Sequence, residues 1–280
     1  MIEKFVDSYK KIIIIPIILT LISLSLIAFN GIDEGVDLRG GSIAEVETDG
    51  SSAIPIQNQL SEKLNDDSIS VMSSGDNKHV TVEMSNEISN SVFTNALGDK
   101  GRVISFNAIG PVLSQEAMNQ VYWALLFAFL FMAITVFIVF REPVPSIGVI
   151  LAALCDIIIA LGGMSLFKIP LNIASVGALL MLIGYSVDTD ILLTTRLLKR
   201  YDGTVTSRAS DAMNTGLTMS AAAITAMVVL YIVTIILIPE ADTITSISSV
   251  LIIGLIADIF TTWFMNLSIL RTYMERKNEN

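Results

Sequence analysis

The stretch Gly184-Tyr-Ser-Val-Asp-Thr-Asp-Ile-Leu-Leu-Thr-Thr-Arg196 decides how the rest of this sequence is interpreted. It closes an apolar run that begins at Leu171, and it places Asp188, Asp190 and Arg196 in a segment long enough to cross a membrane. A charge inside a membrane span costs enough free energy to be a functional hypothesis by default. The rest of the chain has to explain why these charges are tolerated.

The composition excludes a mainly soluble protein. Of the 280 residues, 52% are hydrophobic and only 16% are charged, and the mean hydropathy is +0.68. A soluble domain needs a more strongly charged surface than this. The single cysteine, Cys155, lies in an apolar run, which excludes an intrachain disulfide and argues against a structural zinc site. We interpret it as a small buried hydrophobic residue.

Six apolar runs predict a polytopic α-helical membrane protein with six transmembrane helices, because each run is close to the roughly 20 residues that cross a bilayer. The runs cover residues 12–29, 118–140, 146–167, 171–195, 217–238 and 245–270. The first run follows Lys10 and Lys11, a pattern that a cleaved signal peptide also shows. Because this run is longer than a usual signal-peptide core, we interpret it as a retained membrane anchor.

Residues 30–115, between the first two runs, have the composition of a soluble domain. Alternating patterns predict strands at 42–48, 68–72, 79–84 and 102–109, and helical spacing predicts helices at 54–64 and 88–97. The order strand-helix-strand-strand-helix-strand predicts one small α+β, ferredoxin-like domain. Counted over residues 30–114, this domain has thirteen acidic and five basic residues, so it carries most of the net charge of −10.

The distribution of basic residues predicts how the chain is oriented. Segments on the side of the two termini hold Lys4, Lys10, Lys11, Arg141, Lys199, Arg200, Arg208, Arg271, Arg276 and Lys277, with Arg196 at the boundary. The two short loops on the other side hold only Lys168. Since basic residues accumulate in cytoplasmic segments, we expect a multi-pass protein in the lipid bilayer of the cell membrane. Its termini, residues 1–11 and 271–280, are then cytoplasmic, the spans lie within 116–270 after the first, and the 30–115 domain is extracytoplasmic.

The acidic residues in the apolar runs lie at different depths. Asp156 and Asp258 fall near the centres of the third and sixth runs, close to the bilayer midplane at a rise of ~1.5 Å per residue. Asp188 and Asp190 fall below the middle of the fourth run and lie about 200° apart around a helix, so they cannot both face the same partner. This allows one of them to meet the bundle interior while the other meets a second subunit.

These acids and Arg196 are the candidates for proton coupling. Burial at low dielectric favours the protonated form of a carboxyl group, whereas a nearby arginine favours the ionised form. An acid that gains and loses an arginine can load a proton on one side and release it on the other, driven by about 2.3 kcal/mol per charge per 100 mV. The competing interpretation, strongest for Asp258, is that each acid only hydrogen-bonds a neighbouring helix.

The sequence offers no group for chemical catalysis, so we expect no enzyme activity, no cofactor, no metal site and no nucleic-acid partner. Gly40-Gly41-Ser42 lacks the Gly-Lys-Ser/Thr of a phosphate-binding loop. The only histidine, His79, lies in the predicted external domain, and the motifs supply no nucleophile with an adjacent base.

Several short motifs follow one another along nearly the whole chain. They are Gly35-Val-Asp37-Leu-Arg-Gly40-Gly41, Ile109-Gly110-Pro111, Ala153-Leu-Cys-Asp156, and Gly184-Tyr185-Ser186 leading to Arg196. In this order, and with six spans, the chain resembles the SecD/SecF family of protein-export membrane proteins within the resistance-nodulation-division superfamily. It is most similar to the SecF-type members of archaea. The Gly-Gly motif alone is weak, whereas the ordered set is specific.

The resemblance implies a subunit that pairs with the larger SecD beside the Sec translocon. It implies that the proton motive force moves the external domains and so assists the late steps of preprotein export. The family pattern implicates Asp156 and Arg196 in proton coupling. On this resemblance we expect Asp156 and Arg196 to form such a pair, with Asp188 and Asp190 contributing to helix packing and a partner interface. Bacterial members usually have His where this chain has Cys155, and Asn-Asp-Thr where it has Asp188-Thr189-Asp190. These differences leave the coupling ion open.

Two other functions remain open at the level of the sequence. One is a proton-driven exporter of small molecules or lipids in the same superfamily, whose members usually carry twelve spans in one chain; a substrate-dependent drug-resistance phenotype would favour it. The other is a structural scaffold without ion coupling, for which Asp156→Asn and Arg196→Lys should leave export rates unchanged.

Overall fold

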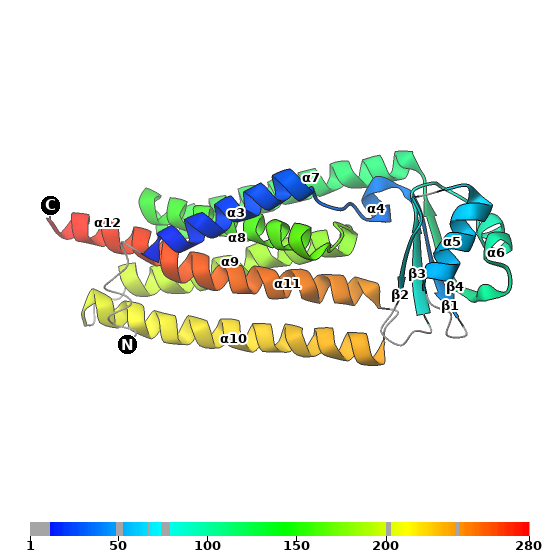
Figure 1. Cartoon of the computed structure of the whole chain (residues 1–280). Coiled ribbons are helices and arrows are strands. Elements are labelled where there is room, and N and C mark those ends of the chain that lie inside the picture. Colours follow the sequence, from blue (N-terminus) through cyan, green and yellow to red (C-terminus); the bar gives the residue numbers. More distant parts are fainter. Residues whose placement is uncertain are drawn as a thin grey trace.

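The protein consists of a bundle of long helices with a small sheet domain at one end (Figure 1). The computed structural model describes residues 12–48, 53–66, 68–73, 79–199, 203–238 and 241–279. The bundle is made of α3 (Ile14–Asn30), α7 (Pro111–Phe140), α8 (Pro143–Phe167), α9 (Ile173–Lys199), α10 (Val205–Leu237), α11 (Asp242–Phe260), the π-helical turn η2 (Thr261–Asn266) and α12 (Leu267–Glu279). The start of α3 and the end of α12 lie at the end of the bundle opposite the sheet (Figure 1).

Five helical segments of the described chain are long and apolar enough to cross a membrane, which confirms a multi-pass membrane protein. Four of them are α7 to α10, and the fifth runs continuously from Thr243 to Lys277 through α11, η2 and α12. The first predicted run forms α3, an apolar helix of 17 residues. This helix packs tightly on α8, since a Cβ atom on Gly162 would lie 2.4 Å from the Cβ of Ser23.

Two helices begin well before the apolar runs that predicted them. α10 begins at Val205, whereas its apolar run begins at Leu217. Thr204 caps this polar first part, because its side chain accepts a hydrogen bond from the backbone N–H of Ser207 over 3.1 Å. α7 begins at Pro111, where a proline is favoured because it has no N–H to leave unpaired. Hydropathy therefore locates the segment that crosses the bilayer, but it does not locate the helix ends.

The sheet domain has the predicted order of elements. Its elements are β1 (Gly41–Glu47), α5 (Ala53–Leu64), β2 (Ser70–Ser73), β3 (His79–Met84), α6 (Asn90–Leu97), the 3-10 turn η1 (Gly98–Lys100) and β4 (Arg102–Ile109). The strands pair antiparallel in the order β2-β3-β1-β4. Alternate residues of the central strands, Val46 and Val82 among them, are buried against Ile56 and Leu60 of α5 and Phe93 of α6. One face of the sheet thus forms a core with the two helices.

A short helix that the sequence did not predict, α4 (Val36–Arg39), joins the bundle to the sheet. Leu38 of α4 packs with Val121 of α7 and Val176 of α9. The backbone N–H of Gly35 donates to the carbonyl of Leu171 over 2.8 Å, so the segment is also fixed to the α8–α9 connection. The GVDLRGG motif, residues 35–41, therefore connects the helical bundle to the sheet domain and packs against the bundle.

Candidate functional site

Three carboxylates lie in the interior of the helical bundle. Asp156 comes from α8, Asp190 from α9 and Asp258 from α11, and they are 1%, 0% and 0% exposed. The three helices pack against one another, which brings the acids together although they are far apart in the sequence. Three buried acids in an apolar bundle need hydrogen-bond donors or neutralising charges close by.

Asp156 is held by two hydroxyl groups, one on each of its oxygens. The Ser186 hydroxyl on α9 donates to Oδ2 over 2.6 Å, and the Thr261 hydroxyl donates to Oδ1 over 2.5 Å. Ser186 belongs to the Gly-Tyr-Ser motif, so that motif contributes a direct contact to an acid on the preceding helix. The donors come from two different helices, and Asp156 therefore ties α8 to both.

Asp258 and Asp190 share a second group of donors. The Thr189 hydroxyl lies 3.0 Å and 3.1 Å from the two carboxylate oxygens of Asp258. The Thr262 hydroxyl lies 3.1 Å from Oδ1 of Asp258 and 2.9 Å from Oδ1 of Asp190. The Asn266 amide nitrogen also donates to Oδ1 of Asp190, over 2.7 Å. One side chain, Thr262, thus lies between two acids from different helices.

The π-helical turn η2 supplies three of these partners. A π-turn inserts an extra residue into a helix and changes which side chains face a given side, and such turns are frequent at functional sites. Here Thr261 reaches Asp156, while Thr262 and Asn266 reach Asp190. The turn therefore directs polar side chains toward acids on both α8 and α9.

Among the described residues, the side chains that contact the three acids are all neutral donors. None of the three carboxylates has a lysine, arginine or histidine among its hydrogen-bond or ion-pair partners within the described part of the chain. Carboxyl and hydroxyl groups in hydrogen-bonding contact can hold a proton and pass it between them. The arrangement is therefore suited to binding protons or small cations in the bundle interior.

The other two predicted residues lie outside this cluster. Asp188 is exposed on the surface of α9, while Asp190, two residues later, is fully buried. The guanidinium of Arg196 donates from Nη1 to the backbone oxygen of Asp211 on α10 over 2.9 Å. The structure therefore does not bring Arg196 to Asp156. Asp156 instead accepts a hydrogen bond from Ser186. Ser186 lies ten residues before Arg196 on α9, and each residue advances the helix by ~1.5 Å.

Sequence reasoning missed the donors of the cluster: Thr189, Thr261, Thr262 and Asn266. A signal for three of them is present in the sequence. Thr261, Thr262 and Asn266 follow Asp258 at intervals of three, four and eight residues, which places them near one face of a helix. A polar face in the last apolar run was therefore readable, but a regular helix would not have predicted that it serves two neighbouring helices.

Two of the remaining motif glycines, Gly41 and Gly110, lie at close contacts between elements. Gly41 has φ +126°, and a Cβ atom there would lie 2.2 Å from the carbonyl oxygen of Met84. Gly110 allows close approach of Glu87, whose Oε2 would lie 2.9 Å from a Cβ atom on that glycine. By contrast, Gly184 lies on an open surface, where a Cβ atom would meet nothing within 4 Å. Asp37 lies in the first turn of α4 and Tyr185 is partly buried on α9.

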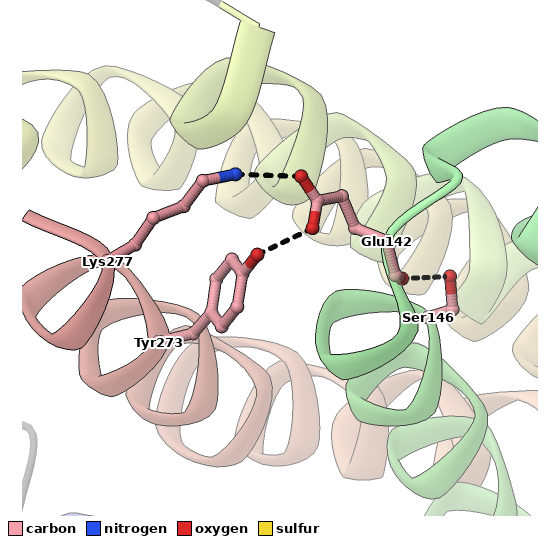
Figure 2. A network of polar contacts seen from close by, with 4 residues as sticks. All are labelled: Glu142, Ser146, Tyr273 and Lys277. Carbon is pink, nitrogen blue, oxygen red and sulfur yellow. Dashed lines mark hydrogen bonds and ion pairs between the residues drawn. The ribbon is translucent and has the colours of Figure 1, made fainter. Parts of the chain in front are cut away.

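A second polar cluster lies at the opposite end of the bundle from the sheet, and Figure 2 shows its residues. Glu142 lies between α7 and α8, and its carboxylate accepts hydrogen bonds from Tyr273 over 2.5 Å and from Lys277 over 2.7 Å. The Ser146 hydroxyl donates to the Glu142 backbone oxygen over 2.8 Å. The bonds from Lys277 and Tyr273 hold the pKa of Glu142 below its ordinary value. This cluster fixes α12 to the α7–α8 turn.

The family model and the most similar relatives that were found all indicate the same family. The model of the family described as protein export membrane protein SecD/SecF, C-terminal, matches residues 88–276. The protein-export membrane protein SecF of Methanothermobacter thermautotrophicus is 55% identical over 98% of this chain and 96% of its own length. The SecF protein of Methanocaldococcus jannaschii is 42% identical over 96% of this chain and 97% of its own length.

The fold also resembles a solved structure. The crystal structure of SecDF, a translocon-associated membrane protein from Thermus thermophilus, superposes with a TM-score of 0.80 at 15% identity. The match covers 97% of this chain and 38% of that longer chain, and at this identity it concerns the fold alone. The family match and the two archaeal relatives decide to which family the chain belongs, and the buried polar cluster and the ordered motifs agree with that assignment. It belongs to the SecD/SecF family of protein-export membrane proteins, as a SecF-type member.

Proposed function

We propose that this chain is the SecF-type subunit of a SecD/SecF complex beside the Sec translocon, and that it couples the proton motive force to late steps of preprotein export. The observation that carries the proposal is the cluster of Asp156, Asp190 and Asp258, buried in the bundle with neutral donors only. A group of this kind can change its proton occupancy when the bundle rearranges. The chain acts in this proposal as a transport subunit and not as an enzyme.

A reconstituted export assay tests this coupling. Purified complexes of SecD with this chain are placed in membranes that contain the translocon, and completion of preprotein export is followed with and without a proton gradient. We expect Asp156→Asn and Asp258→Asn to abolish the acceleration by the gradient, because an amide cannot exchange a proton. Asp99→Asn, in the sheet domain, makes the same chemical change away from the cluster and should export normally. Full gradient-dependent export by both cluster variants would refute the proposal.

The topology that we propose has six membrane spans, because α3 packs into the bundle as a further apolar helix. The sheet domain, with the strand order β2-β3-β1-β4, is then a ferredoxin-like extracytoplasmic domain, and both termini are cytoplasmic. Single cysteines test the orientation in a Cys155→Ser background. A membrane-impermeant thiol reagent added to whole cells should label Asp99→Cys and should leave Glu275→Cys unlabelled. The reverse pattern would overturn the orientation.

The exposed face of α9 is the surface that we propose for SecD. Asp188 and Gly184 are exposed there, with Met181 51% exposed one turn earlier. An acid in the middle of a membrane helix is too costly to leave against lipid, so it favours a partner helix that offers a hydrogen-bond donor or a cation at that depth. Gly184→Phe adds bulk where a Cβ atom meets nothing within 4 Å, so the chain itself should remain folded.

Co-purification from a gentle detergent extract tests this surface. We expect Gly184→Phe and Asp188→Leu to lower the recovery of SecD with the tagged chain. Ile236→Phe adds an aromatic ring on the outer face of α10, where Ile236 is 68% exposed, and should not change it. If Gly184→Phe and Asp188→Leu recover as much SecD as Ile236→Phe, the interface with SecD lies on another face of the bundle.

A further inference from the structure

Two membrane helices of this chain end in the same way, on a basic residue in the left-handed conformation. Arg141 caps the end of α7 with a φ of 56°, and Lys168 caps the end of α8 with a φ of 57°. Lys168 has an acid beside it, because its Nζ lies 3.6 Å from Oδ2 of Asp33. Within the described part of the chain, the guanidinium of Arg141 has no hydrogen bond or ion pair. The protein therefore balances the charge of only one of the two caps.

A second cation lies at the same end of α7. Lys199, in the last turn of α9, donates from Nζ to the backbone oxygen of Val139 over 3.2 Å. Val139 precedes Arg141 by two residues, which is ~3 Å along the helix axis. An ammonium group has three donors, and this bond uses one of them. The ammonium of Lys199 is thus held beside the end of α7, where Arg141 follows, with donors to spare.

The acid next to Arg141 in the sequence is already paired with other residues. The carboxylate of Glu142 accepts hydrogen bonds from Tyr273 and Lys277, and both of these side chains come from α12 (Figure 2). Glu142 therefore balances the charge of Lys277 and not that of Arg141. Among the described residues, no acid forms an ion pair with Arg141 or Lys199. The end of α7 thus carries two positive charges that await an anion.

The position of these cations along α7 corresponds to the level of lipid headgroups. Trp123 of α7 is 53% exposed, and exposed tryptophans are enriched at a membrane–water interface. Arg141 comes 18 residues later, or ~27 Å along the helix, which is close to the ~30 Å of a hydrocarbon core. Arg141 therefore lies at the opposite interface. Phe137 and Ile138, directly before it, are 42% and 65% exposed, so the lipid-facing surface of α7 reaches this cation.

We propose that Arg141 and Lys199 bind the headgroup of an anionic phospholipid, whose hydrocarbon chains lie along the exposed apolar face of α7. The guanidinium presents a planar fork of donors that matches two phosphate oxygens, and the ammonium adds donors from a second helix. A zwitterionic headgroup carries a cation of its own next to the phosphate, so two adjacent protein cations favour a headgroup with net negative charge. A free phosphate shares this chemistry but gains nothing from the apolar face.

The site borders the surface that we propose for SecD. Lys199 follows Asp188 by 11 residues on α9, which brings it to within about 20° of the same direction around the helix. A lipid at the end of α7 therefore lies beside a partner that occupies the Asp188 surface. The inference goes beyond the proposed function, and its test contains no SecD, no preprotein and no proton gradient. Its failure is thus distinguishable from a failure of the export coupling.

Binding of short-chain lipids to the purified full-length chain in a neutral detergent tests the site. Dioctanoyl phosphatidylglycerol, dioctanoyl phosphatidylcholine and inorganic phosphate are titrated separately. Native mass spectrometry counts the bound lipids, and the midpoint of thermal unfolding is measured at each concentration. We expect phosphatidylglycerol to raise the midpoint with saturation and the other two compounds to act about tenfold more weakly. The preference should shrink at roughly 0.5 M salt, because salt screens charges at the surface.

Substitutions then identify the binding residues. Arg141→Gln and Lys199→Gln should each weaken phosphatidylglycerol binding about fivefold, and the double variant should weaken it further. Arg141→Lys keeps the charge and should lose less affinity than Arg141→Gln. Lys168→Gln is the matched control, because it removes the other capping cation, which has Asp33 beside it. Its affinity for phosphatidylglycerol should equal that of the wild type.

Equal affinities for phosphatidylglycerol and phosphatidylcholine would overturn the proposal, and so would unchanged phosphatidylglycerol binding in both Arg141→Gln and Lys199→Gln. Inorganic phosphate that raises the unfolding midpoint as strongly as the lipid would show a site for free phosphate, which also overturns it.

Discussion

The hydroxyl of Thr261 lies 2.5 Å from Oδ1 of Asp156, and this bond joins a π-helical turn to the centre of α8. Thr261→Val removes the hydroxyl and keeps the shape of the side chain. We expect a loss of stability of about 1–2 kcal/mol, because Oδ1 of a buried acid then has no donor. Thermal unfolding of the purified chain in detergent measures the loss.

Thr225→Val is the matched control for this change, because the Thr225 hydroxyl is exposed and bonds the carbonyl of Ala221 over 2.7 Å. Its unfolding midpoint should stay at the wild-type value. Equal midpoints for Thr261→Val and Thr225→Val would mean that the bond to Asp156 contributes nothing to stability.

Gly216 of α10 permits a close contact with η2. A Cβ atom there would lie 2.2 Å from Cζ2 of Trp263, a rigid side chain that is 1% exposed. Gly216→Ala should therefore destabilise the bundle by about 1–3 kcal/mol. A lower unfolding midpoint is the expected measurement, whereas Gly177→Ala, which adds a methyl group in open space, should change it little.

The positions of the membrane helices along the sequence were predictable, because long apolar runs are a strong signal. Five spans follow from apolar runs, and the strand β4 (Arg102–Ile109) begins and ends where its alternation predicts. The short helix α4 was not predictable, because four residues bounded by glycines carry no periodic signal. Its position depends on packing against α7, which lies about eighty residues later in the sequence.

The candidate site was predicted only in part, for a similar reason. Depth along an apolar run identified Asp156 and Asp258, because a charge in such a run is conspicuous. The pairing of Asp156 with Ser186 and Thr261 depends on how three helices rotate about their axes. The π-turn η2 changes locally which side chains face a neighbouring helix. A regular helix with 3.6 residues per turn, which a sequence pattern assumes, does not include this change.

The contact of Glu142 with α12 predicts a pH dependence of stability. The pKa of Glu142 is lower in the folded protein than its ordinary value of 4.5, because Lys277 and Tyr273 stabilise the ionised form. The contribution is therefore fully present above the unfolded pKa and is lost as the pH falls through the folded pKa. We expect Glu142→Gln to lower the unfolding midpoint at pH 7 and to match the wild type at about pH 3.

Unfolding curves of both proteins between pH 3 and about pH 8 test this dependence. Glu116→Gln changes an exposed acid on α7 in the same way and should give parallel curves at every pH. A gap between wild type and Glu142→Gln that widens toward acid pH would contradict the prediction.

The start of β1 depends on Gly41. Its φ of +126° and the approach of a Cβ atom to 2.2 Å from the Met84 oxygen leave no room for a side chain. Gly41→Ala should strain the backbone by about 1–3 kcal/mol and separate β1 from β3 at this point. Faster proteolysis of the sheet domain in the folded membrane protein is the expected result.

Gly98→Ala is the comparison for this variant, because Gly98 also has a positive φ, of +59°, but no atom within 3.7 Å of an added Cβ. It should be cleaved more slowly than Gly41→Ala. The reverse order would contradict the prediction, because Gly41 has both the closer contact and the less accessible φ.

The two chain segments that connect the sheet domain to the bundle meet at one place. The incoming segment ends at Gly40, where a Cβ atom would lie 3.1 Å from the hydroxyl oxygen of Ser114 in the first turn of the outgoing helix α7. Both connections of the sheet domain therefore lie close together, next to α4 and the first turn of α7 (Figure 1). We therefore expect a change in the direction of the first turn of α7 to change the orientation of the whole sheet domain.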